Sequence, residues 1–147
     1  MFTVERLAEQ MNKAATRANL KLEYVFEEDF LGMSDGATIS TAVKINGKEL
    51  EFLYGGVGDT LVLTLSMVSE RMNPAKVKSA LGHYEATKLG KLLALEGIGE
   101  DDDSLLLSYA FASGSNEENA SRLQEIFSLM QSKEESEEFF RLYACFD

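Results

Sequence analysis

The second quarter of the chain alternates apolar and polar side chains, and this pattern constrains the fold more than any other feature. Between residues 37 and 45, Ala37, Ile39, Val43 and Ile45 share one face with Thr41, and the alternation resumes after Asn46 and Gly47. A period of two places the apolar side chains on one face of a β-strand. Asn-Gly favours a type I′ turn, because both central residues of that turn take positive φ angles. The pattern therefore predicts an antiparallel hairpin with one buried face.

Two further segments extend this hairpin to a predicted meander of up to four strands. Residues 20–27 alternate before it, and residues 60–68 alternate after a glycine cluster at residues 55–58. The cluster invites comparison with a phosphate-binding loop. Such a loop needs a Lys-Ser or Lys-Thr pair and a following helix, whereas Asp59 and Thr60 lead directly into a strand. We therefore interpret the glycines as a wide hairpin turn.

Helical spacing and capping residues mark the first two helices. The first twenty residues place apolar side chains three and four residues apart, and Thr3 stands in the N-cap position. Asn73 and Pro74 begin the second helix, because Asn can cap it and proline loses no hydrogen bond at the first helical position. We expect this helix to end near Gly90.

The last third of the chain is predicted to contain a hairpin and a final helix. Two apolar segments, residues 91–98 and 105–112, flank an acidic stretch. Ser115 and Glu118 then have the spacing of a capping box. A second Ser-x-x-Glu pattern at residues 132–135 restarts or kinks this helix before an aromatic tail.

This order of elements predicts an α+β fold. We expect an antiparallel sheet of five or six strands with helices packed on one face, in the order α-β-β-β(-β)-α-β-β-α. A length of 147 residues with 45% hydrophobic content suits one hydrophobic core. We therefore expect a single domain over residues 1–147, with residues 132–147 as a candidate separate helical extension.

Charge and composition restrict the class of partner. The chain has 25 acidic and 14 basic residues, for a net charge of −11, which disfavours binding to a nucleic-acid backbone and favours basic partners. The only cysteine, Cys145, has no partner for an intramolecular disulfide. No apolar run approaches the roughly 20 residues of a membrane span, and the N-terminal segment carries charges where a signal peptide would be apolar. We expect a cytoplasmic protein that binds neither nucleic acid nor membrane.

The acidic stretch consists of Glu100, Asp101, Asp102 and Asp103. A calcium loop that began at Asp101 would need glycine at its sixth position and glutamate at its twelfth, and the chain has leucine and alanine there. Neighbouring carboxylates at a turn also share one environment, so their pKa values would not separate into an acid and a base. We interpret the stretch as the turn between two strands, with a candidate role in electrostatic contact with a basic partner.

No arrangement of residues predicts catalysis. His83 is the only histidine and has no nucleophile motif near it in the sequence. Cys145 lies among aromatic residues near the end of the chain, a setting that indicates packing. We expect no catalytic residues, no cofactor and no metal ion.

Apolar residues exceed what a sheet with one covered face requires. The first helix has an alanine-rich face, and the aromatic tail follows the last helix. The outward-facing positions of the predicted strands are also apolar at Val25, Leu53, Val62 and Val68. Each of these residues could pack internally, but together they indicate a dimer interface or a groove for another chain. We therefore expect Val25, Leu53 and Val62 to contact a partner.

The layout from "NPAKVKSALGHYEATKLG" through "KLLALEGI" and "LLLSYAFA" to "SNEENASRLQEIFSLM" resembles the type III secretion chaperone fold and its YbjN-type relatives. The resemblance covers residues 3–130 and is one of architecture and hydrophobic rhythm. It implies a homodimer that holds an extended polypeptide on apolar patches of the first helix and the strands. Under this resemblance Leu7, Met11 and Ala18 would line the groove, and Val77, Leu81 and Tyr84 would contribute to the dimer interface.

Two hypotheses follow for the function. The first is a non-enzymatic acidic binding protein, chaperone-like or regulatory, that holds a partner polypeptide on an apolar surface. The second is an acidic inhibitor or immunity-type protein that neutralises a basic enzyme by occupying its cationic cleft. Salt separates the two, because the affinity of a charged contact falls steeply with ionic strength and that of an apolar contact does not.

Overall fold

The computed structural model describes residues 3–27, 37–57, 60–69, 73–99, 104–112 and 114–146, without the side chains of residues 24–27 and 57. These residues form five helices and six strands. In chain order they are α1 (Val4–Arg17), β1 (Leu22–Glu27), β2 (Thr38–Ile45), β3 (Lys48–Val57), β4 (Thr60–Val68), α2 (Pro74–Glu85), α3 (Lys88–Leu92), β5 (Ala94–Ile98), β6 (Ser104–Phe111), α4 (Asn116–Gln131) and α5 (Lys133–Ala144).

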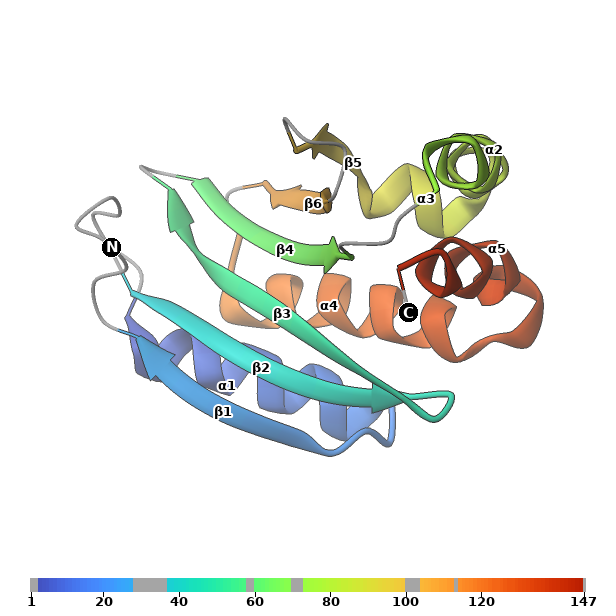
Figure 1. Cartoon of the computed structure of the whole chain (residues 1–147). Coiled ribbons are helices and arrows are strands. Elements are labelled where there is room, and N and C mark those ends of the chain that lie inside the picture. The colour runs from blue at the N-terminus through green and yellow to red at the C-terminus, as the bar shows by residue number, and fades with distance from the viewer. Residues whose placement is uncertain are drawn as a thin grey trace.

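The strands form one open antiparallel sheet in the order β1-β2-β3-β4-β6-β5. This confirms the predicted α+β fold and the six-stranded form of the sheet. The first four strands are the expected meander. Strand β6 pairs with β4, and β5 lies at the edge (Figure 1).

The β2–β3 and β3–β4 turns of the meander differ in how well the sequence predicted them. Asn46 and Gly47 both have positive φ angles, 54° and 77°, as the predicted turn requires. The wide turn from Gly55 is wrong in extent, because β3 continues through the glycines and Val57 pairs with Thr60. The chain can stay extended there because glycine is compatible with a strand that meets close neighbours. Residues 58 and 59 lie outside the described part of the chain.

The predicted helix starts are confirmed by hydrogen bonds. The side chain of Thr3 accepts one from the backbone N–H of Arg6 at 3.2 Å, and Asn73 accepts one from that of Ala75 at 3.0 Å. Ser115 and Glu118 form the reciprocal capping box of α4. These bonds satisfy N–H groups that have no partner within the helix.

The second helix ends earlier than expected. Helix α2 stops at Glu85, and Thr87 caps a separate short helix, α3, by accepting from the N–H of Gly90 at 3.0 Å. Gly90 is therefore inside α3 and does not terminate α2. A Cβ on Gly90 would lie 2.0 Å from the carbonyl oxygen of Tyr84, so only glycine lets α3 approach the end of α2 this closely.

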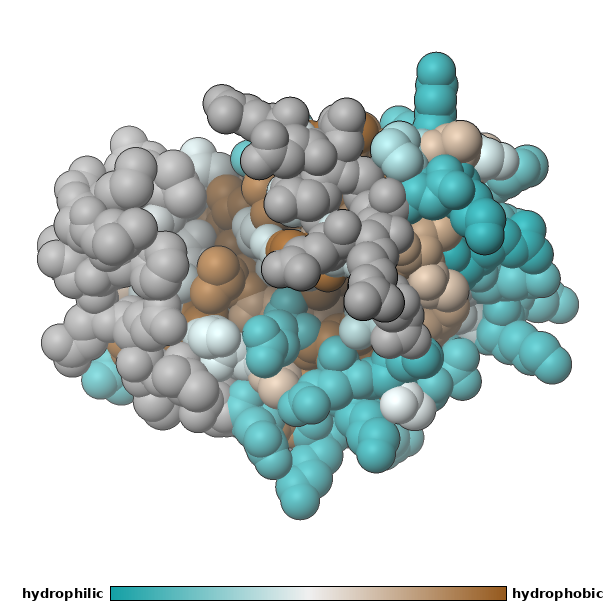
Figure 2. Space-filling view, in the orientation of Figure 1, coloured by the Kyte–Doolittle hydropathy of each residue, from teal (hydrophilic) through white to brown (hydrophobic). Residues whose placement is uncertain are grey.

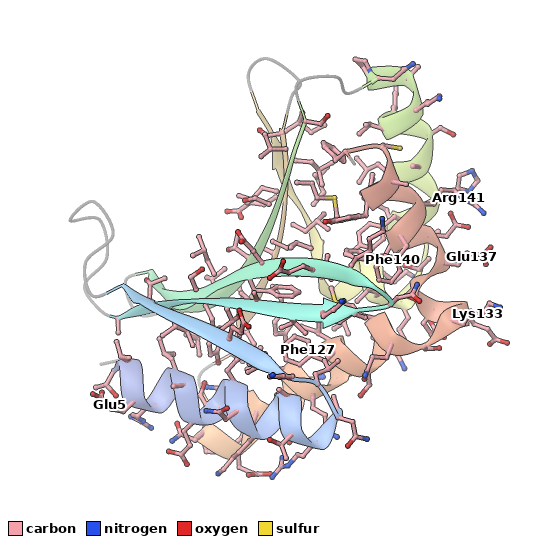
Figure 3. All side chains as sticks on the ribbon, turned by 60° about the horizontal axis from the view of Figure 1, so that its bottom comes forward. Glu5, Phe127, Lys133, Glu137, Phe140 and Arg141 are labelled. Carbon is pink, nitrogen blue, oxygen red and sulfur yellow. The ribbon has the colours of Figure 1, made fainter. Side chains whose placement is uncertain are left out.

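The hydrophobic core lies between one face of the sheet and the helices. In Figure 1, α1 and α4 lie behind the strands, and none of the described helices lies in front of them. Phe127 of α4 is fully buried and meets the ring of Phe52 edge to face, with centroids 5.9 Å apart. Figure 3 shows Phe127 between the sheet and the helices, whereas Glu5, Lys133 and Glu137 point away from the core. The prediction that helices cover one face is confirmed.

The aromatic tail belongs to the same core. Ser132 caps α5 by accepting from the N–H of Glu135 at 3.5 Å, so the helix restarts where the second Ser-x-x-Glu pattern predicted. Helix α5 contributes Phe139, Leu142 and Phe146 to the core cluster. It packs against α2, α3 and α4 at one end of the sheet (Figure 1).

A chain of buried polar side chains joins the sheet to the helices. The hydroxyl of Tyr54 on β3 donates to Oε1 of Gln10 on α1. Nε2 of Gln10 then donates to Oδ1 of Asn116 at the start of α4, at 2.7 Å. Burial raises the pKa of the Tyr54 phenol, so it stays protonated and remains a donor. Each buried group thus gains a partner in place of water.

Candidate functional site: the open face of the sheet

The face of the sheet opposite the core carries no described helix (Figure 1). Alternate residues of β2, β3, β4 and β6 point to this side, since their neighbours along each strand point into the core. We call the following set the neutral face: Thr38, Ser40, Ala42, Leu53, Gly55, Val62, Thr64, Ser66, Leu106, Ser108 and Ala110.

The set leaves out the charged residues on the same side of the sheet, which are Glu23, Lys44, Glu49 and Glu51; its members have hydroxyl, alanine, glycine or aliphatic side chains. The strand register shows how they fit together: Leu53 lies between Ser40 and Thr64, and Val62 lies between Gly55 and Ala110. The exposed fraction of Leu53 is 37%. Figure 2 shows brown and pale surface over the middle of this face and teal surface toward its lower and right margins.

Charged residues gather at one end of the open face, near the β2–β3 turn. Lys44 and Glu49 are exposed and stand directly opposite each other on neighbouring strands. Glu51 follows two residues after Glu49 and is also exposed. Opposite charges in a cross-strand pair favour each other and leave little net charge. The middle of the face therefore offers a contact of low polarity, bordered by charges at this end.

Gly55 gives the neutral face its one tight internal contact. It pairs with Thr38 on β2, and a Cβ on Gly55 would lie 2.4 Å from Oγ1 of Thr38. The side chain of Thr38 therefore occupies the space that any other residue at position 55 would need. Val62 lies opposite Gly55 in the register, and Ala110 lies opposite Val62 on the next strand.

The structure brings together only part of the predicted partner-binding set. Leu53 and Val62 lie on neighbouring strands of the neutral face. Val25 of β1 pairs with Ser40, but its side chain lies outside the described part of the chain. Val68 extends the same face at the end of β4 and has an exposed fraction of 63%.

The three predicted groove residues of α1 are inside the core. Leu7 and Met11 are fully buried, and Ala18 is 7% exposed. They hold α1 on the covered face of the sheet, where their burial from water stabilises the fold. In the folded chain they offer no surface to a partner, because the apolar stripe of α1 already packs in the core of its own chain.

The sequence analysis missed the contribution of β6. Leu106 and Ser108 face outward next to Ser66 and Thr64, and Ala110 is exposed beside Val62. The sequence of β6 does not show which side faces outward, because its three consecutive leucines fit either face. The pairing of β6 with β4 decides it.

The predicted dimer-interface residues are on the other side of the molecule. Tyr84 is fully buried, and its hydroxyl donates to the backbone carbonyl of Leu93; burial raises the pKa of this phenol. Val77 and Leu81 are 3% and 7% exposed. They form the floor of a groove of about 280 Å³, which we call the α2 groove, lined by Pro74, Val77, Lys78, Leu81, Ile98, Ser104 and Leu105.

The acidic residues Glu100, Asp101, Asp102 and Asp103 lie outside the described part of the chain. Their flanks are described: the N–H of Gly99 donates to the carbonyl of Ser104 at 2.9 Å, and Ile98 pairs with Leu105. The prediction that this stretch connects two strands is confirmed. Its predicted electrostatic role stays a prediction.

The described residues provide little for catalysis or metal binding. Among them, no three His, Cys, Asp or Glu side chains lie close enough to hold a metal ion. His83 is exposed on α2, and Sγ of Cys145 is 3.5 Å from the carbonyl of Arg141 in its own helix. None of the described helices is both long enough and apolar enough to cross a membrane.

Comparison of the chain with protein-family models, with curated proteins and with solved structures gave no match.

Proposed function

We propose that the protein is a non-enzymatic binding protein that holds a partner polypeptide on the neutral face of its sheet. The observation that supports this most is that no charged residue interrupts the middle of that face. Water-facing positions of a one-sided antiparallel sheet usually alternate to polar residues. Here Ser and Thr fill some of these positions, and alanine and aliphatic side chains fill others across four strands.

The chemistry of the neutral face suits an uncharged stretch of polypeptide. Leu53, Val62 and Leu106 supply apolar area, and hydroxyl groups of Ser40 and Thr64 adjoin Leu53 and can bond a backbone that lies across the strands. Burying apolar area supplies most of the affinity of such contacts, at roughly 25 cal/mol per Å² before the costs of association. A chaperone-like or regulatory protein in the manner of the secretion chaperones would use a surface of this kind.

A photo-crosslinking experiment tests the proposal. A benzoylphenylalanine in place of Leu53 lies on the neutral face, and one in place of Glu134 lies on the exposed first turn of α5. We expect a discrete polypeptide adduct from position 53 in the native cell and none from position 134. Leu53→Asp with Val62→Asp should weaken binding of the captured partner at least about tenfold, because two carboxylates would be buried against it.

The salt dependence of this binding distinguishes the proposal from an acidic inhibitor. If the partner polypeptide binds to the neutral face, its affinity should change less than about threefold between 0.05 and 0.5 M NaCl. An inhibitor that occupies a cationic cleft would lose affinity steeply over this range. Equal adducts from positions 53 and 134, or a steep loss with salt, would contradict the neutral face as the binding surface.

The homodimer that the resemblance implies stays a prediction. Light scattering at tens of micromolar checks it directly, and the double aspartate variant shows whether the neutral face takes part. If the wild-type chain is a dimer and the variant a monomer, the neutral face is occupied by a second copy and the partner must bind elsewhere.

A further inference from the structure

The α2 groove is the second surface of the molecule that is suited to a partner, and it lies on the helix side of the sheet. Val77, Leu81 and Leu105 form its apolar floor, each with an exposed fraction below a tenth. Ile98 of the edge strand β5 forms a wall and is 47% exposed. Ile98 pairs with Leu105, whose side chain is buried on the covered face, so the groove and the neutral face open on different sides.

The helix that lines this groove, α2, and the short helix α3 that follows it carry more basic than acidic residues, in contrast to the chain as a whole. Helices α2 and α3 carry Lys76, Lys78, Lys88 and Lys91 against the single acid Glu85, whereas the whole chain has 25 acidic and 14 basic residues. Lys78 lines the groove itself. The first turn of α2 contains no acidic residue.

We propose that the α2 groove binds a segment of a partner protein that inserts an apolar side chain between Leu81 and Ile98 and places a carboxylate against Lys78. The apolar side chain removes the floor and the exposed Ile98 from water. The ammonium group of Lys78, at the border of an apolar surface, gains an ion pair that is partly shielded from solvent.

The net charge of −11 does not prevent an acidic segment from binding here. At physiological ionic strength the Debye length is about 8 Å, so Lys78 at the groove acts on the ligand more strongly than carboxylates on distant surfaces.

The experiment uses the full chain, labelled with nitrogen-15, and three synthetic peptides. The peptides share their length and a central leucine pair and differ only in the flanking residues, which are glutamate, glutamine or lysine. We expect the glutamate peptide to shift the amide signals of Lys78, Leu81 and Ile98 and to bind at least about fivefold more tightly than the glutamine peptide. The lysine peptide should bind most weakly.

Two charge-reversal variants and one apolar variant locate the contact. Lys78→Glu should weaken binding of the glutamate peptide about tenfold. Lys88→Glu changes the net charge by the same amount on α3, outside the groove, and should weaken it less than about twofold. Ile98→Thr keeps a β-branched side chain at an edge-strand position and should weaken binding about threefold through lost apolar area.

Three results would overturn this inference. Equal losses in the two lysine variants would reduce it to nonspecific charge attraction, and equal binding of the three peptides would remove the role of Lys78. A dimer in light scattering that dissociates on Ile98→Asp would assign the groove to a second copy. The inference does not rest on the neutral face, because the peptides and variants here leave Leu53 and Val62 unchanged.

Discussion

The two faces of the sheet are built from alternate residues of the same strands, and they differ in almost every physical property. On β4, Leu61, Leu63 and Leu65 are buried, whereas Thr64 between them is only half-buried and faces the open side. The covered face is filled by α1, α4 and the aromatic side chains of the core. The open face is packed by nothing in the described chain.

This difference distinguishes residues that the fold requires from residues that it does not require. Apolar residues on the covered face are explained by the burial that stabilises the fold. Folding places no such demand on the open face, where charged residues would be tolerated and would keep the sheet soluble. Burial in the core therefore does not explain the uncharged residues in the middle of the open face, which lie beside Lys44, Glu49 and Glu51 at one end. The predictions below compare the two faces by equivalent substitutions.

The largest difference is expected between two leucines on adjacent strands. Leu63→Ala removes a fully buried side chain from the covered face and should lower the free energy of unfolding by about 2–5 kcal/mol. Leu53→Ala truncates a side chain that is 37% exposed on the open face and should cost less than about 1 kcal/mol. Urea denaturation followed by circular dichroism measures both. Similar losses in the two variants would mean that the open face is also covered in the folded protein.

The buried polar chain tests whether the covered face depends on hydrogen bonds as well as on apolar contact. Tyr54→Phe leaves Oε1 of Gln10 buried without its donor and should cost about 1–3 kcal/mol. Gln10→Leu leaves the Tyr54 hydroxyl without an acceptor and should cost a similar amount. The double variant should be less destabilised than the sum of the two, with a coupling above about 0.5 kcal/mol. Strict additivity would show that the two side chains do not interact.

The features that sequence reasoning predicted correctly are those determined by neighbours in the chain. Thr3, Asn73 and Ser115 cap helices because a cap bonds to N–H groups two or three residues away. Asn46 and Gly47 form their turn for a similarly local reason. Alternation then identifies which side of β2, β3 and β4 is buried, without any knowledge of the partners.

The features that it missed depend on contacts distant in the sequence. The break between α2 and α3 requires the Tyr84 hydroxyl to reach Leu93 and Gly90 to approach the Tyr84 carbonyl. The outward side of β6 depends on its pairing with β4, from which α2, α3 and β5 separate it in the chain. The apolar stripe of α1 can be recognised in the sequence. Its periodicity is the same whether the stripe packs against the sheet of its own chain or binds another protein.

Gly55 is expected to be an exception on the open face. A Cβ at this position would overlap Oγ1 of Thr38 and approach its Cα to 2.9 Å, so Gly55→Ala should destabilise the protein by about 1–2 kcal/mol despite its position opposite the core. Thr38→Ala in the same chain should recover only part of this loss, because the contact with the backbone persists. Full tolerance of alanine at position 55 would show that β2 and β3 can move apart there. Thermal unfolding monitored by circular dichroism provides the measurement.

The smallest effect should be a gain in stability, and it again compares one residue type on the two faces. Thr41 on β2 is 1% exposed, and its Oγ1 has no hydrogen-bond partner among the described residues. Thr41→Val removes a buried hydroxyl that is desolvated without compensation and should raise the free energy of unfolding by about 1 kcal/mol. Thr64→Val makes the same change where solvent reaches the side chain on the neutral face, and should alter stability by less than about 0.5 kcal/mol. Urea midpoints at constant m-value measure both changes. If Thr41→Val destabilises the protein, then the Thr41 hydroxyl has a hydrogen-bond partner in solution, such as a water molecule that enters the core.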